Sequence, residues 1–174
     1  MSRRKTAYDI TKTAMMLALA LVLSILEAWL LPRGILPVPG FKLGLANIAI
    51  LVTLYSVGKK EALLVAVLRS VVVLALGGNI VGFLFSLLGG MAAWGTMCVL
   101  CERKHVSIFG VSIAGAASHG IGQILAALWV TKTVYVIGYL PYLILLGSSA
   151  GALIAFLTIP VVKALDHIGN EMVQ

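Results

Sequence analysis

The sequence predicts an all-α integral membrane protein, because of its composition, its long apolar segments and the uneven distribution of its basic residues. Of the 174 residues, 61% are hydrophobic and only 11% are charged, and the mean hydropathy is +1.09. Soluble domains carry about 25% charged residues on average, so this composition excludes a soluble domain. We expect residues 1–174 to form a single transmembrane domain, which begins with a short basic cytoplasmic segment, residues 1–12.

Six apolar segments follow one another along the chain, and turn-forming or polar residues separate them. These segments cover residues 13–31, 43–57, 61–76, 80–100, 108–130 and 139–165. A helix of about 20 apolar residues spans the hydrocarbon core of a bilayer, so we expect six transmembrane helices. Among the breaks are "LPRGILPVPG", where proline ends a helix, and the polar "CERKHVS". Segments 43–57 and 61–76 are short, and a five-helix arrangement in which 43–57 is re-entrant is the alternative.

The basic residues indicate how the chain lies in the membrane. With six spans, most of them fall on the side of both termini, and only Arg33, Lys42 and Lys132 fall on the other side. The positive-inside rule therefore places both termini in the cytoplasm. Lys42 is expected to extend its ammonium group to the outer head groups. The charges are scattered over short loops, which favours contact with anionic lipid over a nucleic-acid partner.

The sequence lacks the motifs that would make the chain an enzyme by itself. Its acidic residues are far apart, so no carboxylate cluster is available to hold a metal-bound diphosphate. It also lacks a phosphate-binding loop for ATP hydrolysis. Cys98 and Cys101 form a C-x-x-C pair with only His105 nearby, a spacing that is usually incidental in a helix. We therefore expect no catalytic residue, no metal ion and no cofactor.

Polar residues inside the apolar segments are the candidates for a binding site, because such residues are costly in lipid and are usually functional. The predicted topology places most of them at or above the membrane midplane, which indicates a polar pocket open to the outside. The candidate substrate-binding residues are Glu27, Asn47, Arg69, Asn79, His119 and Gln123. Their groups suit a small, partly apolar molecule with an anionic head. Phe83, Phe85 and Trp129 could form its apolar walls.

Structural roles for the same residues are the alternative. Arg69 could form an ion pair with Glu27, and Asn47 could be a hydrogen-bond clamp between helices. His119 and Gln123 are four residues apart and share one helix face, where they could make an ordinary helix–helix contact. That face also carries glycine, alanine and serine in the stretch "GAASHGIGQ", which favours the wall of a pocket.

Several motifs resemble a known family. They are "PGFKLGLANI", "GGNIVGFLFSLLGG" and "SHGIGQ", together with the first apolar segment "TAMMLALALVLSILEAWLLP". The chain resembles the Gx transporter family, often labelled heptaprenyl diphosphate synthase component I, and the S components of energy-coupling factor (ECF) transporters. The resemblance covers nearly the whole chain and implies a six-helix S-component bundle with both termini inside. No prenyl-synthase motif and no vitamin-specific signature can be placed on the sequence.

The resemblance also implies a set of partners. S components bind a small molecule outside the cell and dock on a membrane coupling protein, which works with two ATPase subunits in an ABC importer. Docking in these proteins uses an Ala-x-x-x-Ala patch on the first helix, which Ala14 and Ala18 match here. Small residues four apart let two helices approach closely in lipid.

Three functions therefore stand as hypotheses. The first is a substrate-binding subunit of an ECF-type importer that takes up a vitamin or a vitamin precursor. The second, suggested by the prenyl diphosphate label, is a membrane partner in an isoprenoid-quinone or flavin-linked electron-transfer pathway. The third is a structural subunit of a larger membrane complex.

Overall fold

The computed structural model describes residues 7–30, 42 and 44–171, and all regular structure in this part of the chain is helical. The elements are α1 (Ala7–Leu30), α2 (Asn47–Ser56), α3 (Lys59–Ala75), α4 (Ile80–Leu100), α5 (Ile108–Thr131), the 3-10 helix η1 (Val134–Tyr139) and α6 (Leu140–Glu171). The prediction of an all-helical chain is confirmed. The ends of α4 agree with the predicted segment, and α1 begins at Ala7, within the segment that was predicted to be a cytoplasmic extension.

Side-chain caps explain where helices α4 and α5 begin. The side chain of Asn79 accepts a hydrogen bond from the backbone N–H of Gly82, and the hydroxyl of Ser107 accepts one from the N–H of Gly110. These residues satisfy N–H groups that have no partner in the first turn of a helix. The polar residues between the apolar segments therefore act as N-caps of α4 and α5.

Four of the helical stretches in the described residues are long and apolar enough to cross a membrane: α1, α4, α5 and residues 134–165. The chain is thus a multi-pass membrane protein. Helix α2 has 10 residues, which at 1.5 Å per residue is about half of the hydrocarbon thickness. Helices are found in all six predicted segments, but α2, with 10 residues, and α3, with 17, are not among the described stretches that are long and apolar enough for a full span.

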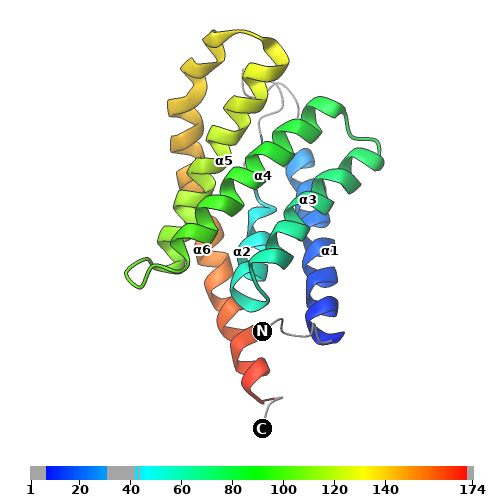
Figure 1. Cartoon of the computed structure of the whole chain (residues 1–174), viewed down its shortest axis with the longest axis vertical. Helices are drawn as coiled ribbons and strands as arrows, with labels where there is room; N and C mark the ends of the chain where they lie inside the picture. The colour runs from blue at the N-terminus through cyan, green and yellow to red at the C-terminus, as the bar shows by residue number, and fades with distance from the viewer. Residues whose placement is uncertain (1–6, 31–41, 43, 172–174) are drawn as a thin grey trace.

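The helices form one bundle in which α1 begins and α6 ends at the same end of the molecule (Figure 1). We call this the terminal end. The turn between α2 and α3 and the loop between α4 and α5 also lie there, and a salt bridge between Lys59 and Glu102 joins them. Trp94 on α4 adds a hydrogen bond from its indole N–H to the carbonyl of Lys59, at 2.9 Å. The residue after α5, Lys132, lies at the opposite end.

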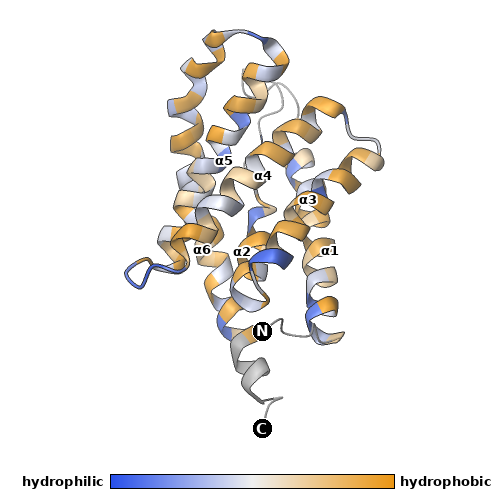
Figure 2. Cartoon of the chain, viewed as in Figure 1, coloured by the Kyte–Doolittle hydropathy of each residue, from blue (hydrophilic) through white to orange (hydrophobic). Residues whose placement is uncertain are grey.

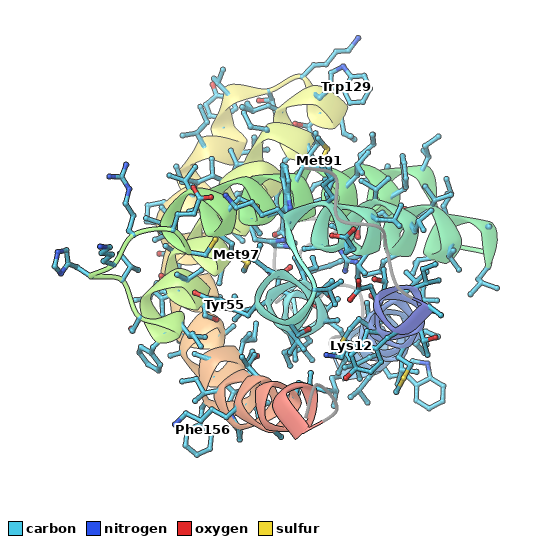
Figure 3. All side chains as sticks on the ribbon, turned by 60° about the horizontal axis from the view of Figure 1, so that its bottom comes forward. Lys12, Tyr55, Met91, Met97, Trp129 and Phe156 are labelled. Carbon is cyan, nitrogen blue, oxygen red and sulfur yellow. The ribbon has the colours of Figure 1, made fainter. Side chains whose placement is uncertain are left out.

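Hydrophobic residues cover most of the length of the helices, and hydrophilic residues gather in the loop between α4 and α5 (Figure 2). The exposed surface of the bundle is apolar: Trp129 is 64% exposed and Phe156 is 73% exposed, and both point away from the bundle (Figure 3). Met97, by contrast, is fully buried in the core. An apolar outer surface on this scale suits the acyl chains of a bilayer.

Helix α2 lies in the centre of the core, where the side chains from Ala49 to Thr53 are fully buried. Around it, glycine allows helices to approach one another closely. A Cβ atom on Gly122 of α5 would lie 2.4 Å from the carbonyl oxygen of Leu88 on α4, and one on Gly147 of α6 would lie 2.9 Å from the carbonyl oxygen of Ala116. This close packing of α4, α5 and α6 holds the polar residues of α5 in fixed positions.

Candidate functional site

Arg69 is buried in the half of the bundle away from the terminal end, with 1% of its surface exposed. Its Nη1 donates to the hydroxyl of Ser24 on α1 at 3.3 Å, and its Nη2 donates to the carbonyl of Ser86 on α4 at 3.4 Å. Both hydrogen bonds are long, and Nε donates to no group in the described part of the chain. Ser70, one residue further along α3, donates to or accepts from the hydroxyl of Ser86 at 3.1 Å.

Glu27, which is 3% exposed, holds the turn that precedes α2. Its Oε1 accepts from the N–H of Gly44 at 2.7 Å, and its Oε2 accepts from the N–H of Leu45 at 3.2 Å. A carboxylate at the start of a helix is also favoured by the helix dipole. Glu27 and Arg69 are close enough to interact electrostatically, but they form no salt bridge among the described residues, so the ion pair weighed from the sequence is not present. The carboxylate is occupied by backbone N–H groups instead.

Asn47 and His119 both lie beside Gly44. A Cβ atom on Gly44 would lie 2.8 Å from Nδ2 of Asn47 and 3.5 Å from Cδ2 of His119. The imidazole also packs flat against α4, because a Cβ atom on Gly89 would lie 2.8 to 3.0 Å from its ring atoms. Both side chains are buried, yet neither ring nitrogen of His119 and neither amide atom of Asn47 makes a well-aligned hydrogen bond in the described structure.

Gln123, one turn further along α5, is also buried. Its Nε2 donates to the carbonyl of Lys42 at 2.9 Å, while its Oε1 accepts from no described group. Lys42 is half-buried, and its ammonium group donates to the carbonyl of Gly82 on α4 at 3.4 Å. Lys42, which was predicted to reach the outer head groups, thus also hydrogen-bonds to the first turn of α4.

Residues from five successive parts of the chain thus meet in one place, which we call the polar cluster. It consists of Glu27, Lys42, Asn47, Arg69, Ser86, His119 and Gln123. Five of the six predicted substrate-binding residues belong to it. Ser24 and Ser70 were not predicted, although a serine inside an apolar segment is the same kind of signal as Asn47.

Asn79, the sixth candidate, is not part of the polar cluster. It is exposed at the start of α4, where its side chain caps the helix. Two of the three aromatic residues predicted as apolar walls of the pocket lie elsewhere in the bundle. Trp129 faces outward, and Phe85 packs in a separate apolar group with Ala126 and Val136.

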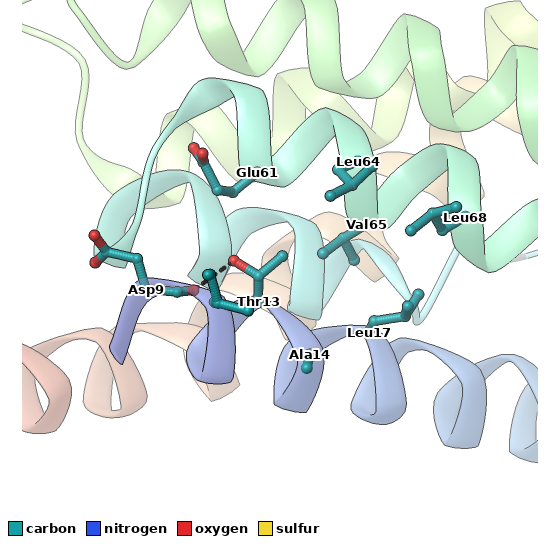
Figure 4. A pocket seen from close by; sticks show the side chains of 9 residues that line it. Asp9, Thr13, Ala14, Leu17, Glu61, Leu64, Val65 and Leu68 are labelled. Atoms are coloured by element: carbon teal, nitrogen blue, oxygen red, sulfur yellow. Dashed lines mark hydrogen bonds between the residues drawn. The ribbon is translucent and has the colours of Figure 1, made fainter. Parts of the chain in front are cut away.

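A cavity of about 220 Å³ lies elsewhere, between α1 and α3 in the half of the bundle nearer the terminal end (Figure 4). Its walls are almost entirely apolar, and two acidic residues stand at one end. The residues that line it include Asp9, Ala14, Leu17, Glu61, Val65 and Leu68. The two predicted docking residues, Ala14 and Ala18, are both exposed on α1.

The two cysteines lie near the terminal end as free thiols. Cys98 is buried, and the Sγ of Cys101 donates to its carbonyl oxygen at 3.3 Å, as expected for residues one turn apart. The described residues contain no group of three or more metal-ligating His, Cys, Asp or Glu side chains. Nothing in this geometry assigns the pair a function.

The fold and the buried polar cluster define a class of protein: a multi-pass helical membrane protein with polar groups concentrated in one half of its bundle. The solved structure of the S component of a bacterial ECF transporter has this fold. It superposes with a TM-score of 0.73 over 94% of this chain and 98% of that chain, with 18% sequence identity. At that identity the likeness is one of fold.

The sequence itself identifies the family. Residues 16–160 match the model of the family described as heptaprenyl diphosphate synthase component I. Because this match covers most of the chain, the protein belongs to that family, and the resemblance seen in the sequence motifs is confirmed. No curated protein matches the sequence significantly.

Proposed function

We propose that this protein is the substrate-binding subunit of an ECF-type ABC importer and captures a small anionic molecule from outside the cell. The observation that carries the proposal is the polar cluster, in which Asn47, His119 and Gln123 are buried with polar atoms that make no well-aligned hydrogen bond to a described group. Buried polar atoms are nearly always hydrogen-bonded in folded proteins, and in a membrane they are especially costly. A bound molecule would supply the missing partners.

The positions of the charged loops support an outward-facing site. Lys59, Arg103 and the start of α1 share the terminal end, and the positive-inside rule favours the cytoplasm for that end. The polar cluster would then lie in the outer half of the membrane. Cysteine labelling tests this orientation: Lys132→Cys should react with an impermeant reagent in intact cells, and Lys59→Cys only after the membrane is opened. The reverse result would place the cluster on the cytoplasmic side.

The energy for uptake would come from partners, since the sequence has no phosphate-binding loop of its own. The exposed Ala14 and Ala18 would dock on the coupling membrane protein, which in turn would bind two ATPase subunits. The cavity beside Ala14 supports this surface as the docking face, because a side chain of a neighbouring helix could enter it. We propose no catalytic role for the chain itself.

Mass spectrometry of the gently purified protein is the decisive experiment. A small anionic molecule should be released on denaturation from the wild type, and much less from His119→Ala. Ser112→Ala is the matched control, because Ser112 is buried on the same helix but its hydroxyl already donates to the carbonyl of Gly151 at 2.7 Å. The coupling protein and two ATPases should also purify with the chain. Equal release from His119→Ala and the wild type would contradict a site at the polar cluster.

The description of the family favours one alternative, a membrane partner in an isoprenoid-quinone or flavin-linked electron-transfer pathway. This function predicts a different set of bound molecules. A quinone, or a flavoprotein partner in place of ATPases, should then purify with the chain.

A further inference from the structure

We infer that the polar cluster binds a molecule that carries a single carboxylate and several N–H donors, and that it rejects diphosphates. The inference rests on the proposed function and narrows its substrate class. Two independent features of the cluster lead to it: the balance of buried charge, and the kinds of polar atoms that lack a partner.

The charge balance favours a monoanion. Among the described residues, the cluster contains two cations, Arg69 and the half-buried Lys42, and one anion, Glu27, so their formal charges sum to +1. Both oxygens of Glu27 already accept backbone N–H groups. A buried charge is costly unless it is compensated, and one negative charge from a ligand would compensate this one. A diphosphate carries several negative charges and would leave the cluster with an excess of buried anions.

Arg69 is placed to receive a carboxylate. Its two hydrogen bonds, to Ser24 and Ser86, go to neutral oxygens at 3.3 and 3.4 Å, and its Nε donates to no described group. The edge formed by Nε and Nη2 is one of the two edges on which a guanidinium can bind a carboxylate through two parallel hydrogen bonds.

The remaining unpaired atoms require donors as well as acceptors on the ligand. Oδ1 of Asn47 and Oε1 of Gln123 can only accept hydrogen bonds. Nδ2 of Asn47 can only donate, and a neutral His119 has one nitrogen of each kind. An amide, a ureide or a nitrogen heterocycle offers both kinds of group, whereas an isoprenoid chain offers neither. The ligand we infer therefore combines such a group with its carboxylate.

Four probes test the two requirements separately on the full-length protein in lipid nanodiscs. Hydantoin-5-acetate has the carboxylate and the N–H donors; its methyl ester lacks the charge; cyclohexylacetate lacks the donors; geranyl diphosphate has neither feature. We expect hydantoin-5-acetate to bind roughly 10- to 100-fold more tightly than its ester or cyclohexylacetate, the effect of losing a buried charged or polar pairing. Geranyl diphosphate should bind no better than the ester.

Variants show which residue recognises the carboxylate of the ligand and which recognises its N–H donors. Arg69→Lys keeps the charge but loses the forked donors, and should reduce the preference for the acid over its ester. Asn47→Ala should bring the ratio of affinities for hydantoin-5-acetate and cyclohexylacetate close to 1 and leave the preference for acid over ester. Ser112→Ala should change neither ratio. Because a ratio of two ligands is measured on the same folded protein, a general loss of stability does not alter it.

The outcomes separate the inference from the function on which it rests. If the ester or geranyl diphosphate binds as tightly as the acid, the inferred substrate class is wrong, but a small-molecule site remains. If neither the probes nor any metabolite of a cell extract binds to the wild type, the proposed function fails, and the inference fails with it.

Discussion

Two regions of this bundle differ in a way that bears on how a membrane protein's binding site is found. The cavity between α1 and α3 is open but almost wholly apolar, and the exposed Ala14 stands on its wall. The polar cluster between α1 and α5 is closely packed, and its residues from Glu27 to Gln123 are nearly all buried. The cavity therefore has room but few polar groups. The polar cluster has many polar groups, and several of their atoms have no hydrogen-bond partner among the described residues.

The difference follows from the solvent. In lipid, an apolar groove on the surface of a bundle is filled by acyl chains or by another helix, so it indicates packing more than ligand chemistry. An unpaired polar atom in the same medium has no water to pair with, so it indicates a ligand far more strongly. This difference supports the proposal of partner docking at the first region and substrate binding at the second.

The largest expected effect separates the two regions directly. Ala14→Trp or Ala18→Trp places a large side chain on the proposed docking face and should abolish assembly with the coupling protein and ATPases, measured by co-purification. Small-molecule binding by the isolated subunit should be unchanged, because the polar cluster is in the other half of the bundle. Leu125→Trp, on an exposed position of α5, is the matched control and should assemble normally. Intact assembly in the α1 variants would remove the docking role from this face.

Glu27→Ala should give the next largest effect, on stability. It leaves two buried backbone N–H groups and the nearby Arg69 without their anion, which should cost about 3 kcal/mol of unfolding free energy. Glu27→Gln keeps one acceptor oxygen and should cost about half as much. Denaturant titration in detergent micelles measures both. If Glu27→Gln is as stable as the wild type but no longer binds substrate, Glu27 is a ligand for the substrate, as its sequence position first indicated.

His119→Ala and Gln123→Ala should act on binding and leave the fold nearly unchanged. Each removes a buried hydrogen-bonding group worth about 1–3 kcal/mol, so the affinity for the released small molecule should fall roughly 10- to 100-fold. The melting temperature should stay close to that of Ser112→Ala. If His119→Ala is largely unfolded but its folded fraction binds the small molecule as tightly as the wild type, His119 is a packing residue.

Much of the fold could be predicted from the sequence because each helix carries its own signal. Apolar runs predicted the helical segments, whereas the capping roles of Asn79 and Ser107 were not predicted. The length of α2 was less certain, since the apolar segment 43–57 includes the turn before Asn47 that Glu27 holds. That contact joins residues 17 positions apart, and no local pattern predicts it.

The polar cluster was predicted in outline because polar side chains inside apolar segments are conspicuous in the sequence. Arg69, His119 and Gln123 stand out in apolar segments whatever the fold. The sequence could not show which of these groups are already paired, because pairing depends on how helices pack. Asn79 looked like a pocket residue and is a helix cap, and the hydrogen bond from Lys42 to Gly82 was not predicted. Glycine at position 89 makes room for His119 and glycine at position 44 for Asn47, but glycine alone does not say what it makes room for.

The smallest expected effect, on stability, comes from removing an exposed charge at the terminal end. This change tests whether exposed charges contribute less than the buried charges of the polar cluster. Lys59 and Glu102 form an exposed salt bridge at the terminal end, and the ammonium of Lys59 holds the pKa of Glu102 below its ordinary value. Because the pKa is lower in the folded protein, the stabilisation is present above the ordinary pKa of a glutamate and is lost as the pH falls through the lowered one. Exposed pairs contribute little, so Glu102→Gln should lower the melting temperature only slightly at pH 7. The wild type and the variant should converge at acidic pH, in a thermal unfolding series in detergent. If the melting temperature at pH 7 falls by a large amount instead, the exposed salt bridge holds helices together as the buried polar cluster does. Burial would then not explain the difference between the two sets of charges.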